Sequence, residues 1–145
     1  MQDMNSLTHS VWICKYHVVW IPKCRKKKLY ADIAKYLEKT FHELAMRRES
    51  RIVEGHICPY HIHTLIEIPP KYSIVQVVGY IKGKSAIHIA RTYRGRKQNL
   101  TGKNFWVKGY CVSTEGRDEE SIKKYIREQE VEDKRLDQLE FFKDN

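Results

Sequence analysis

The sequence predicts one α+β domain in which an antiparallel sheet carries two helices on one face. Apolar residues alternate along four short segments, as in half-buried strands, and recur every three or four residues in two longer segments, as in amphipathic helices. With a charged helix at the end, the order is βαββαβ, which is that of the ferredoxin-like fold. At 145 residues the chain suffices for one hydrophobic core. Residues 1–145 are therefore expected to form a single domain, with an acidic tail over about residues 131–145.

The first half of the chain is expected to supply three strands and a helix. The first strand covers Val11–Trp20, where every second residue from Trp12 onward is apolar or aromatic. Lys23–Lys28 is expected to form a basic loop, and Tyr30–Arg48 a helix. Arg51–Ile57 and His61–Ile68 are expected to pair as a hairpin. The stripe that the helix is expected to bury consists of Ile33, Tyr36, Leu37, Phe41 and Leu44.

The second half is expected to supply a helix, a strand and a charged helix. Ser73–Tyr93 is expected to be helical, with the serine as its N-cap. After a polar loop, Phe105–Thr114 is expected to be the fourth strand. The charged helix opens at Arg117 or Asp118 and reaches about Gln129. The residues of Ser73–Tyr93 that are expected to face the core are Ile74, Val77, Val78, Ile81, Ile87 and Ala90.

A pair of histidines, His61 and His63, is the most informative feature of the chain. Residues i and i+2 of a strand point to the same face, so the two imidazoles project together, with Cβ atoms about 7 Å apart. Ile62, Ile66 and Ile68 occupy the natural core face, which leaves the histidines on the more open side of the sheet. Paired imidazoles there favour a metal site, although two polar residues on a solvated face would give the same spacing.

Positive charge is concentrated in the body of the chain. Residues 1–114 carry 20 Lys and Arg against 7 Asp and Glu, whereas residues 115–145 carry 7 against 11, for a net charge of +9. Such an excess, with aromatic residues among the basic clusters, favours a polyanion, and nucleic acid is the first candidate. The residues expected to contact the nucleic acid, which the family resemblance described below implies is DNA, are Lys23, Arg25, Lys26, Lys27, Lys28, Lys82, Lys84 and Arg91.

The sequence disfavours several classes of protein. No apolar run approaches the roughly 18 residues of a membrane span, and no secretory signal is recognised, so a cytoplasmic protein without a membrane partner is expected. The four cysteines form no CxxC pair and are expected to be reduced. A zinc site of Cys58, His61 and His63 is an alternative, although Pro59 sets a turn between the thiol and the strand.

Tyr125 differs from the other tyrosines because it lies in the charged C-terminal helix. It can complete a narrow apolar stripe with Ile122 and Ile126, which would give it a structural role. Gln129 follows Tyr125 by four residues, about one helical turn, so both side chains can face one site. A phenol offers a nucleophilic oxygen, and a carboxamide offers a carbonyl ligand for Mg²⁺ or Mn²⁺.

The chain resembles a known family. The histidine pair resembles the His-hydrophobic-His (HUH) metal motif, and nearly the whole chain resembles the single-tyrosine HUH transposases of the insertion-sequence 200/605 family. The most specific stretch is Gly109–Gln129, which ends in Ser-Ile-Lys-Lys-Tyr-Ile-Arg-Glu-Gln. Three departures touch no proposed catalytic residue: Ile62 where valine is usual, Cys24 in the basic loop and Glu115 in the turn before the last helix.

The resemblance implies a site and a reaction. His61 and His63 would bind Mg²⁺ or Mn²⁺ with Gln129 as a third protein ligand, and Tyr125 would attack a phosphodiester of single-stranded DNA. The products would be a 5′-phosphotyrosine link and a free 3′-hydroxyl, and a later 3′-hydroxyl would reverse the attack without ATP. The family also implies a homodimer that recognises hairpins at the ends of the element. Whether Tyr125 serves its own subunit or the partner subunit stays open.

Other interpretations of the same residues also stay open. A non-enzymatic binding module for single-stranded DNA or RNA would share the fold, the charge and the open sheet face. A HUH nickase of replication or conjugation would use the same chemistry, although such proteins are usually longer and often carry two neighbouring tyrosines. A zinc hydrolase would bind its metal through Cys58, His61 and His63. The acceptor of the phenol proton is also undecided between Glu67, on the histidine parity, and Glu128, near Tyr125.

Overall fold

The computed structural model of the chain centres on a four-stranded antiparallel sheet with the strand order β4-β5-β3-β6. The inner strands are β3 (Lys15–Trp20) and β5 (Ile62–Glu67), and the edges are β4 (Arg51–Ile57) and β6 (Cys111–Ser113). The structure describes residues 5–6, 11–12, 14–23, 27–58, 60–92, 105–114, 120–121, 123–129 and 131.

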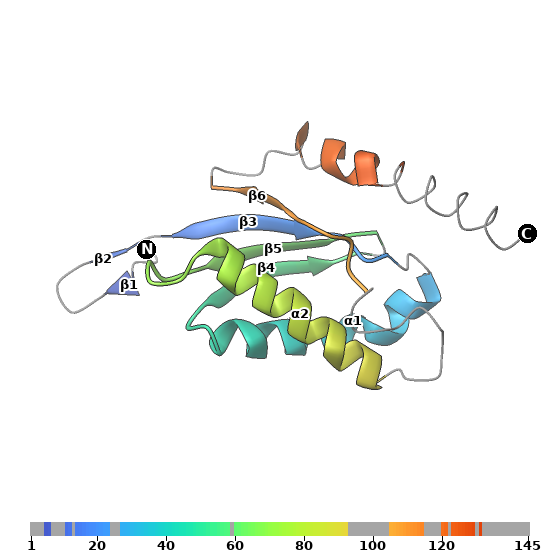
Figure 1. Cartoon of the computed structure of the whole chain (residues 1–145), viewed down its shortest axis with the longest axis horizontal. Coiled ribbons are helices and arrows are strands. Elements are labelled where there is room, and N and C mark those ends of the chain that lie inside the picture. The colour runs from blue at the N-terminus through green and yellow to red at the C-terminus, as the bar shows by residue number, and fades with distance from the viewer. Residues whose placement is uncertain are drawn as a thin grey trace, which may run out of the picture.

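Two long helices cover one face of this sheet, and a helical segment near the C-terminus lies over the other face (Figure 1). The long helices are α1 (Lys27–Met46) and α2 (Ile74–Thr92). Residues 120, 121 and 123–129 are also helical, and we call them the C-terminal helical segment. The strand order and the placement of the helices confirm the predicted α+β, ferredoxin-like architecture. No helix within the described ranges is long and apolar enough to cross a membrane.

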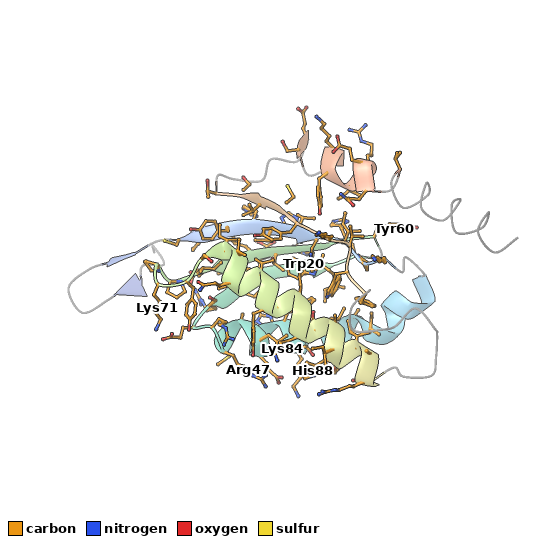
Figure 2. The ribbon with its side chains drawn as sticks, viewed as in Figure 1. Trp20, Arg47, Tyr60, Lys71, Lys84 and His88 are labelled. Carbon is orange, nitrogen blue, oxygen red and sulfur yellow. The ribbon has the colours of Figure 1, made fainter. Side chains whose placement is uncertain are left out.

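The hydrophobic core lies between the sheet and the two long helices. Ile62, Ile66 and Ile68 are buried there, as the alternation of the third strand predicts. Thr64 lies in the same row, and its hydroxyl donates a hydrogen bond of 3.2 Å to the Val18 carbonyl, so burial leaves this hydroxyl satisfied. Figure 2 shows Trp20 between the sheet and the helices. The predicted stripe of α1 is confirmed: Tyr36 is partly buried, and Ile33, Leu37, Phe41 and Leu44 are buried.

The first predicted strand is divided in the structure. Its beginning forms β2 (Val11–Trp12), which pairs with β1 (Asn5–Ser6), and its end forms β3, which pairs with β5 and β6. Between the two parts, the Cys14 carbonyl accepts a hydrogen bond of 3.0 Å from the Ile68 amide. Alternation does not show where a strand exchanges partners, because both parts keep the same parity.

α1 differs from its predicted bounds at both ends. It begins at Lys27 rather than Tyr30, so Lys27 and Lys28 belong to its first turn and not to a basic loop, because lysine is a good helix former. It ends at Met46, a little earlier than predicted. Glu49, just beyond that end, has φ of 52°, the left-handed conformation that commonly terminates helices.

α2 begins as predicted and then buries a different stripe. The Ser73 hydroxyl accepts a hydrogen bond of 3.1 Å from the Gln76 amide, and the Gln76 side chain accepts one of 2.8 Å from the Ser73 amide. The expectation that Ile87 faces the core is wrong, because its side chain is 38% exposed. Ser85 is buried instead and accepts a hydrogen bond from the Trp106 indole at 3.0 Å. Because serine is polar, the apolar pattern did not include Ser85 in the buried stripe and assigned Ile87 to it. The other predicted positions are buried (Val77, Val78, Ile81) or half-buried (Ile74, Ala90).

The fourth predicted strand, Phe105–Thr114, is shorter than expected. Trp106 forms an isolated bridge with Pro22, and regular pairing resumes only in β6. Between these points Gly109 has φ of 90°, which interrupts the extended backbone and which glycine adopts without a steric penalty. A conformation set by one glycine leaves no trace in the hydrophobic alternation.

Residues 105–110, which we call the strap, are anchored to α2. The Lys82 ammonium donates hydrogen bonds to the carbonyls of Val107, at 3.0 Å, and Gly109, at 2.5 Å. Trp106 adds its bond to Ser85. The strap leads directly into β6 and so toward the C-terminal helical segment.

Candidate active site

The histidine pair lies on the sheet face opposite the core. In the register of the sheet, His63 of β5 is opposite Val19 of β3, and Val19 is in turn opposite Cys111 of β6. On the other side His63 is opposite His56 of β4. His61 directly precedes β5 with the same parity. We call this surface, which carries these residues, the histidine face.

The histidine face is not as open as the sequence predicts. His63 is only 8% exposed, and His61 is half-buried. The C-terminal helical segment lies over this face (Figure 1). Paired imidazoles that are largely shielded from water are better suited to bind a ligand than to serve as a solvated polar surface.

Tyr125 lies in this covering segment, next to the β6 side of the histidine face. The side chain is half-buried, and its hydroxyl oxygen is buried without a hydrogen-bond partner among the described residues. Burial raises the pKa of the Tyr125 phenol above its usual value of 10.0, and the nearby Cys111 thiol raises the pKa further. A buried polar atom without a hydrogen-bond partner is unfavourable, so a bound ligand that supplies a partner for this hydroxyl would remove the penalty.

Gln129 lies one helical turn beyond Tyr125 and is half-buried. Ile126 is half-buried as well, and Ile122 is outside the described residues, so the structural stripe proposed for Tyr125 is seen only in part. The burial of the Tyr125 hydroxyl distinguishes it from a tyrosine that only fills an apolar stripe, because such a residue would place its oxygen in water or against a partner.

His17 is a third imidazole on this face, and it was not among the residues predicted to form the site. Its ring lies edge-on to that of His63, with centroids 5.6 Å apart and an interplanar angle of 67°. The signal that could have found it was parity. His17 alternates with Tyr16 and Val18, which contact or join the core, so it must point to the opposite face.

The zinc alternative is contradicted by the structure. Among the described residues, which include Cys58, His61 and His63, no three His, Cys, Asp or Glu side chains are placed to hold one metal ion. The Cys58 amide donates a hydrogen bond of 2.9 Å to the His61 carbonyl, which closes a tight turn between thiol and strand. Burial also raises the pKa of the Cys58 thiol, which disfavours the thiolate that zinc requires.

The position of Glu67 does not suit the role of proton acceptor. Its buried carboxylate accepts two hydrogen bonds from the Arg51 guanidinium, at 3.0 and 3.1 Å, and Lys15 lies 3.7 Å away. It also stands four residues along the strand from His63, a separation of about 13 Å. Because both carboxylate oxygens are engaged by Arg51, Glu67 is poorly placed to take the phenol proton. Glu128 is exposed.

The predicted DNA contacts divide between different environments. Lys23 is exposed, whereas Arg25 and Lys26 lie outside the described residues. The Lys82 ammonium is engaged in anchoring the strap, so it has a structural role in this chain. Lys84 and Arg91 are exposed on α2, in the helix layer and away from the histidine face; Figure 2 labels Lys84 there.

Comparison with known proteins identifies the family. Residues 10–129 match the family model described as "Transposase IS200 like". The chain belongs to the IS200-like transposase family. It is 38% identical over 139 residues to the transposase for insertion sequence element IS200 of Salmonella typhimurium, covering 96% of this chain and 91% of the relative. It is 29% identical over 120 residues to the ISDra2 transposase TnpA of Deinococcus radiodurans, covering 82% and 86%.

Solved structures agree with this assignment. A crystal structure of a candidate transposase from Deinococcus radiodurans superposes with a TM-score of 0.77 and 27% identity, covering 87% of this chain and 98% of the other. A REP-associated tyrosine transposase bound to a REP hairpin shares the fold, with a TM-score of 0.53 and 15% identity, covering 84% and 68%. This IS200-like transposase is therefore a DNA transposase with the fold of its relatives.

Proposed function

We propose that this IS200-like transposase cleaves and rejoins single-stranded DNA through a covalent link to Tyr125. The observation that carries the proposal is the position of the phenol: its buried, unpartnered hydroxyl lies beside the histidine face. His61 and His63 would hold a divalent cation, Mg²⁺ or Mn²⁺, with Gln129 as a third protein ligand. Two imidazoles, a carboxamide oxygen and water form a donor set that suits either ion.

The chemistry exchanges one phosphodiester for another. The Tyr125 oxygen forms a bond to phosphorus, the bond to the 3′-oxygen breaks, and the proton lost by the phenol is balanced by one gained at the leaving 3′-hydroxyl through solvent. Because the raised pKa keeps the phenol protonated at neutral pH, its oxygen needs help to react. A bound cation would supply that help by neutralising charge on the phosphate, worth several kcal/mol. No net phosphodiester is lost, so rejoining needs no ATP.

The partners of the reaction follow the same reasoning. The net charge of +9 supports a DNA ligand, and a structural relative is bound to a REP hairpin. We extend hairpin recognition at the element ends, a homodimeric assembly and action in the cytoplasm to this chain as part of the proposal.

A covalent-adduct assay tests the proposed chemistry. Purified protein is mixed with labelled single-stranded DNA from the flanks of its own gene, with Mg²⁺ or Mn²⁺, and resolved on a denaturing gel. We expect a shifted, protease-sensitive band that disappears with Tyr125→Phe and with chelator. Tyr80→Phe is the matched control, because Tyr80 lies on α2, where its ring stacks under Arg48 at 3.7 Å. This control should form the adduct normally.

Two results would contradict the proposal. An adduct that persists in Tyr125→Phe would place the nucleophile elsewhere. DNA binding without an adduct under any metal would instead favour a non-enzymatic binding module of the same fold.

A further inference from the structure

His17 is the residue of the histidine face that the proposed chemistry does not use. It lies on β3. On one side of β3 is β5, which carries His63, and on the other side is β6, beside which Tyr125 lies. Its Cα partners in the register are Leu65 of β5 and Ser113 of β6. His63 is its diagonal neighbour on β5, at a distance that lets the two side chains touch.

Two observations separate His17 from a residue that merely fills space. The first is its edge-on contact with the ring of His63, with centroids 5.6 Å apart. Such a contact restricts how the neighbouring ring can turn. The second is that its Nδ1 atom is buried and has no hydrogen-bond partner among the described residues. Leaving a buried polar atom unsatisfied costs about 1–3 kcal/mol, a penalty that an apolar side chain would avoid.

We propose that His17 is a third imidazole of the active site, which orients His63 through its ring and directs Nδ1 to an oxygen atom that arrives with the ligands. The inference rests on the proposed function, since it assumes that His63 binds the cation. The oxygen belongs either to the scissile phosphate or to a water molecule of the cation. An Nδ1–H group would donate to that oxygen, and the donated bond would satisfy the buried atom.

His17 is not itself assigned as a metal ligand. Within the described part of the chain, no three His, Cys, Asp or Glu side chains are placed to hold one ion, although His17, His61 and His63 are all included. The role of the His17 ring is therefore positioning. Residues that do not bind the metal but orient one of its ligands typically contribute 10–100-fold to metal affinity.

Two substitutions separate the two parts of the proposal. His17→Ala removes the whole ring, whereas His17→Phe keeps an aromatic ring against His63 and removes both ring nitrogens, Nδ1 among them. His56→Phe is the matched control. His56 also lies on the histidine face, opposite His63 in the register, but it is exposed and bonded to Glu54 at 2.7 Å.

The first readout is the affinity for Mn²⁺ without DNA, followed by electron paramagnetic resonance. We expect His17→Ala to weaken this affinity by 10–100-fold and His56→Phe to leave it unchanged. If His17→Ala, folded by circular dichroism, binds Mn²⁺ as tightly as the wild type, the positioning role is overturned. If that variant does not fold, the ring contact is tested on the wild type by nuclear Overhauser effects between the His17 and His63 ring protons, whose absence would overturn it.

The second readout is the rate of adduct formation at saturating Mn²⁺ and DNA. A bond from Nδ1 to the phosphate predicts that His17→Phe binds Mn²⁺ within threefold of the wild type but forms the adduct about 10–100-fold more slowly. A bond to a metal-bound water predicts that the same variant already weakens Mn²⁺ binding without DNA. If His17→Phe matches the wild type in both readouts, Nδ1 has no such role. A wild type that forms no adduct refutes the proposed function, while the Mn²⁺ affinities still test the contact between His17 and His63.

Discussion

Single residues on the histidine face differ in how much of their position the sequence could predict. The parity of the third strand correctly placed His63 on the face opposite the isoleucines. For His61, which directly precedes β5, the same placement stays a prediction. The parity did not predict that His63 would be buried, because burial depends on residues distant in the sequence, such as His17, whose ring lies against that of His63. Contacts between distant segments, such as that between His17 and His63, are equally absent from local patterns.

The ion pairs of Glu67 lead to a prediction at this scale. Glu67→Gln keeps the shape of the side chain and removes the charge that accepts two hydrogen bonds from Arg51. We expect the free energy of unfolding to fall by about 1–2 kcal/mol, because charge-assisted bonds at a buried group are lost. Urea unfolding measures this loss.

The same variant tests the proton acceptor. At full saturation with DNA and Mn²⁺, Glu67→Gln should form the adduct at the wild-type rate, because its carboxylate is engaged by Arg51 and its backbone position lies about 13 Å along the strand from that of His63. A rate that falls a hundredfold or more in a folded Glu67→Gln protein would restore Glu67 as a catalytic group.

Among the elements, the strap shows how a few contacts redirect a predicted strand. The hydrophobic pattern over Phe105–Thr114 correctly indicated buried chain at Phe105–Val107 and a strand at Cys111–Ser113, although Val112 in that strand is 41% exposed. The break between them depends on Gly109 and on two hydrogen bonds from Lys82, which lies more than twenty residues earlier. The sequence therefore predicted that the element exists but not its interruption, and it assigned to DNA a lysine that holds the backbone.

The contribution of Lys82 to the stability of the folded chain is expected to depend on pH. Burial lowers the pKa of Lys82 from 10.5 to about 8 in the folded chain. Between about pH 8 and 10.5 the unfolded chain therefore binds more protons at this site than the folded chain does, so the contribution of Lys82 to stability rises with pH. Lys82→Met lacks this titration.

We expect the difference in unfolding free energy, wild type minus Lys82→Met, to increase from pH 7.5 to pH 10. Thermal unfolding of both proteins in matched buffers measures it. A difference that stays flat would mean that the two carbonyl acceptors stabilise the ammonium as strongly as burial opposes it.

For the molecule as a whole, the sheet separates two layers with different tasks. One face carries the core, and the other carries the histidines and the covering segment with Tyr125 (Figure 1). The strand order and the helix layer were predictable, because period and element order leave few topologies. The covering of the histidine face was not, because the sequence does not state where a charged helix returns.

The distribution of charge predicts how the whole molecule binds DNA. Arg91 is exposed on the helix layer, away from the histidine face. If it neutralises one phosphate, Arg91→Gln should make the slope of log affinity against log salt shallower by about 0.7 to 0.9. The adduct rate at saturating DNA should not change. Fluorescence anisotropy over a salt series measures the slope.

Lys39→Gln is the control for this measurement. Lys39 is 81% exposed on α1, but Glu43 lies 4.0 Å from it and offsets its charge. Its substitution should leave the slope unaltered. Equal slopes for Arg91→Gln and the wild type would remove Arg91 from the DNA contacts.

The separation of the two layers also affects what happens to this gene when it decays. Tyr125 and the histidine pair are not part of the core cluster between the sheet and the helices. If Tyr125 is the nucleophile, as proposed, a copy that has lost it would still fold and still bind its DNA. In a cell with several copies of the element, such a protein would compete with intact ones for the same ends. Loss of chemistry would then turn a transposase into an inhibitor of its own mobility.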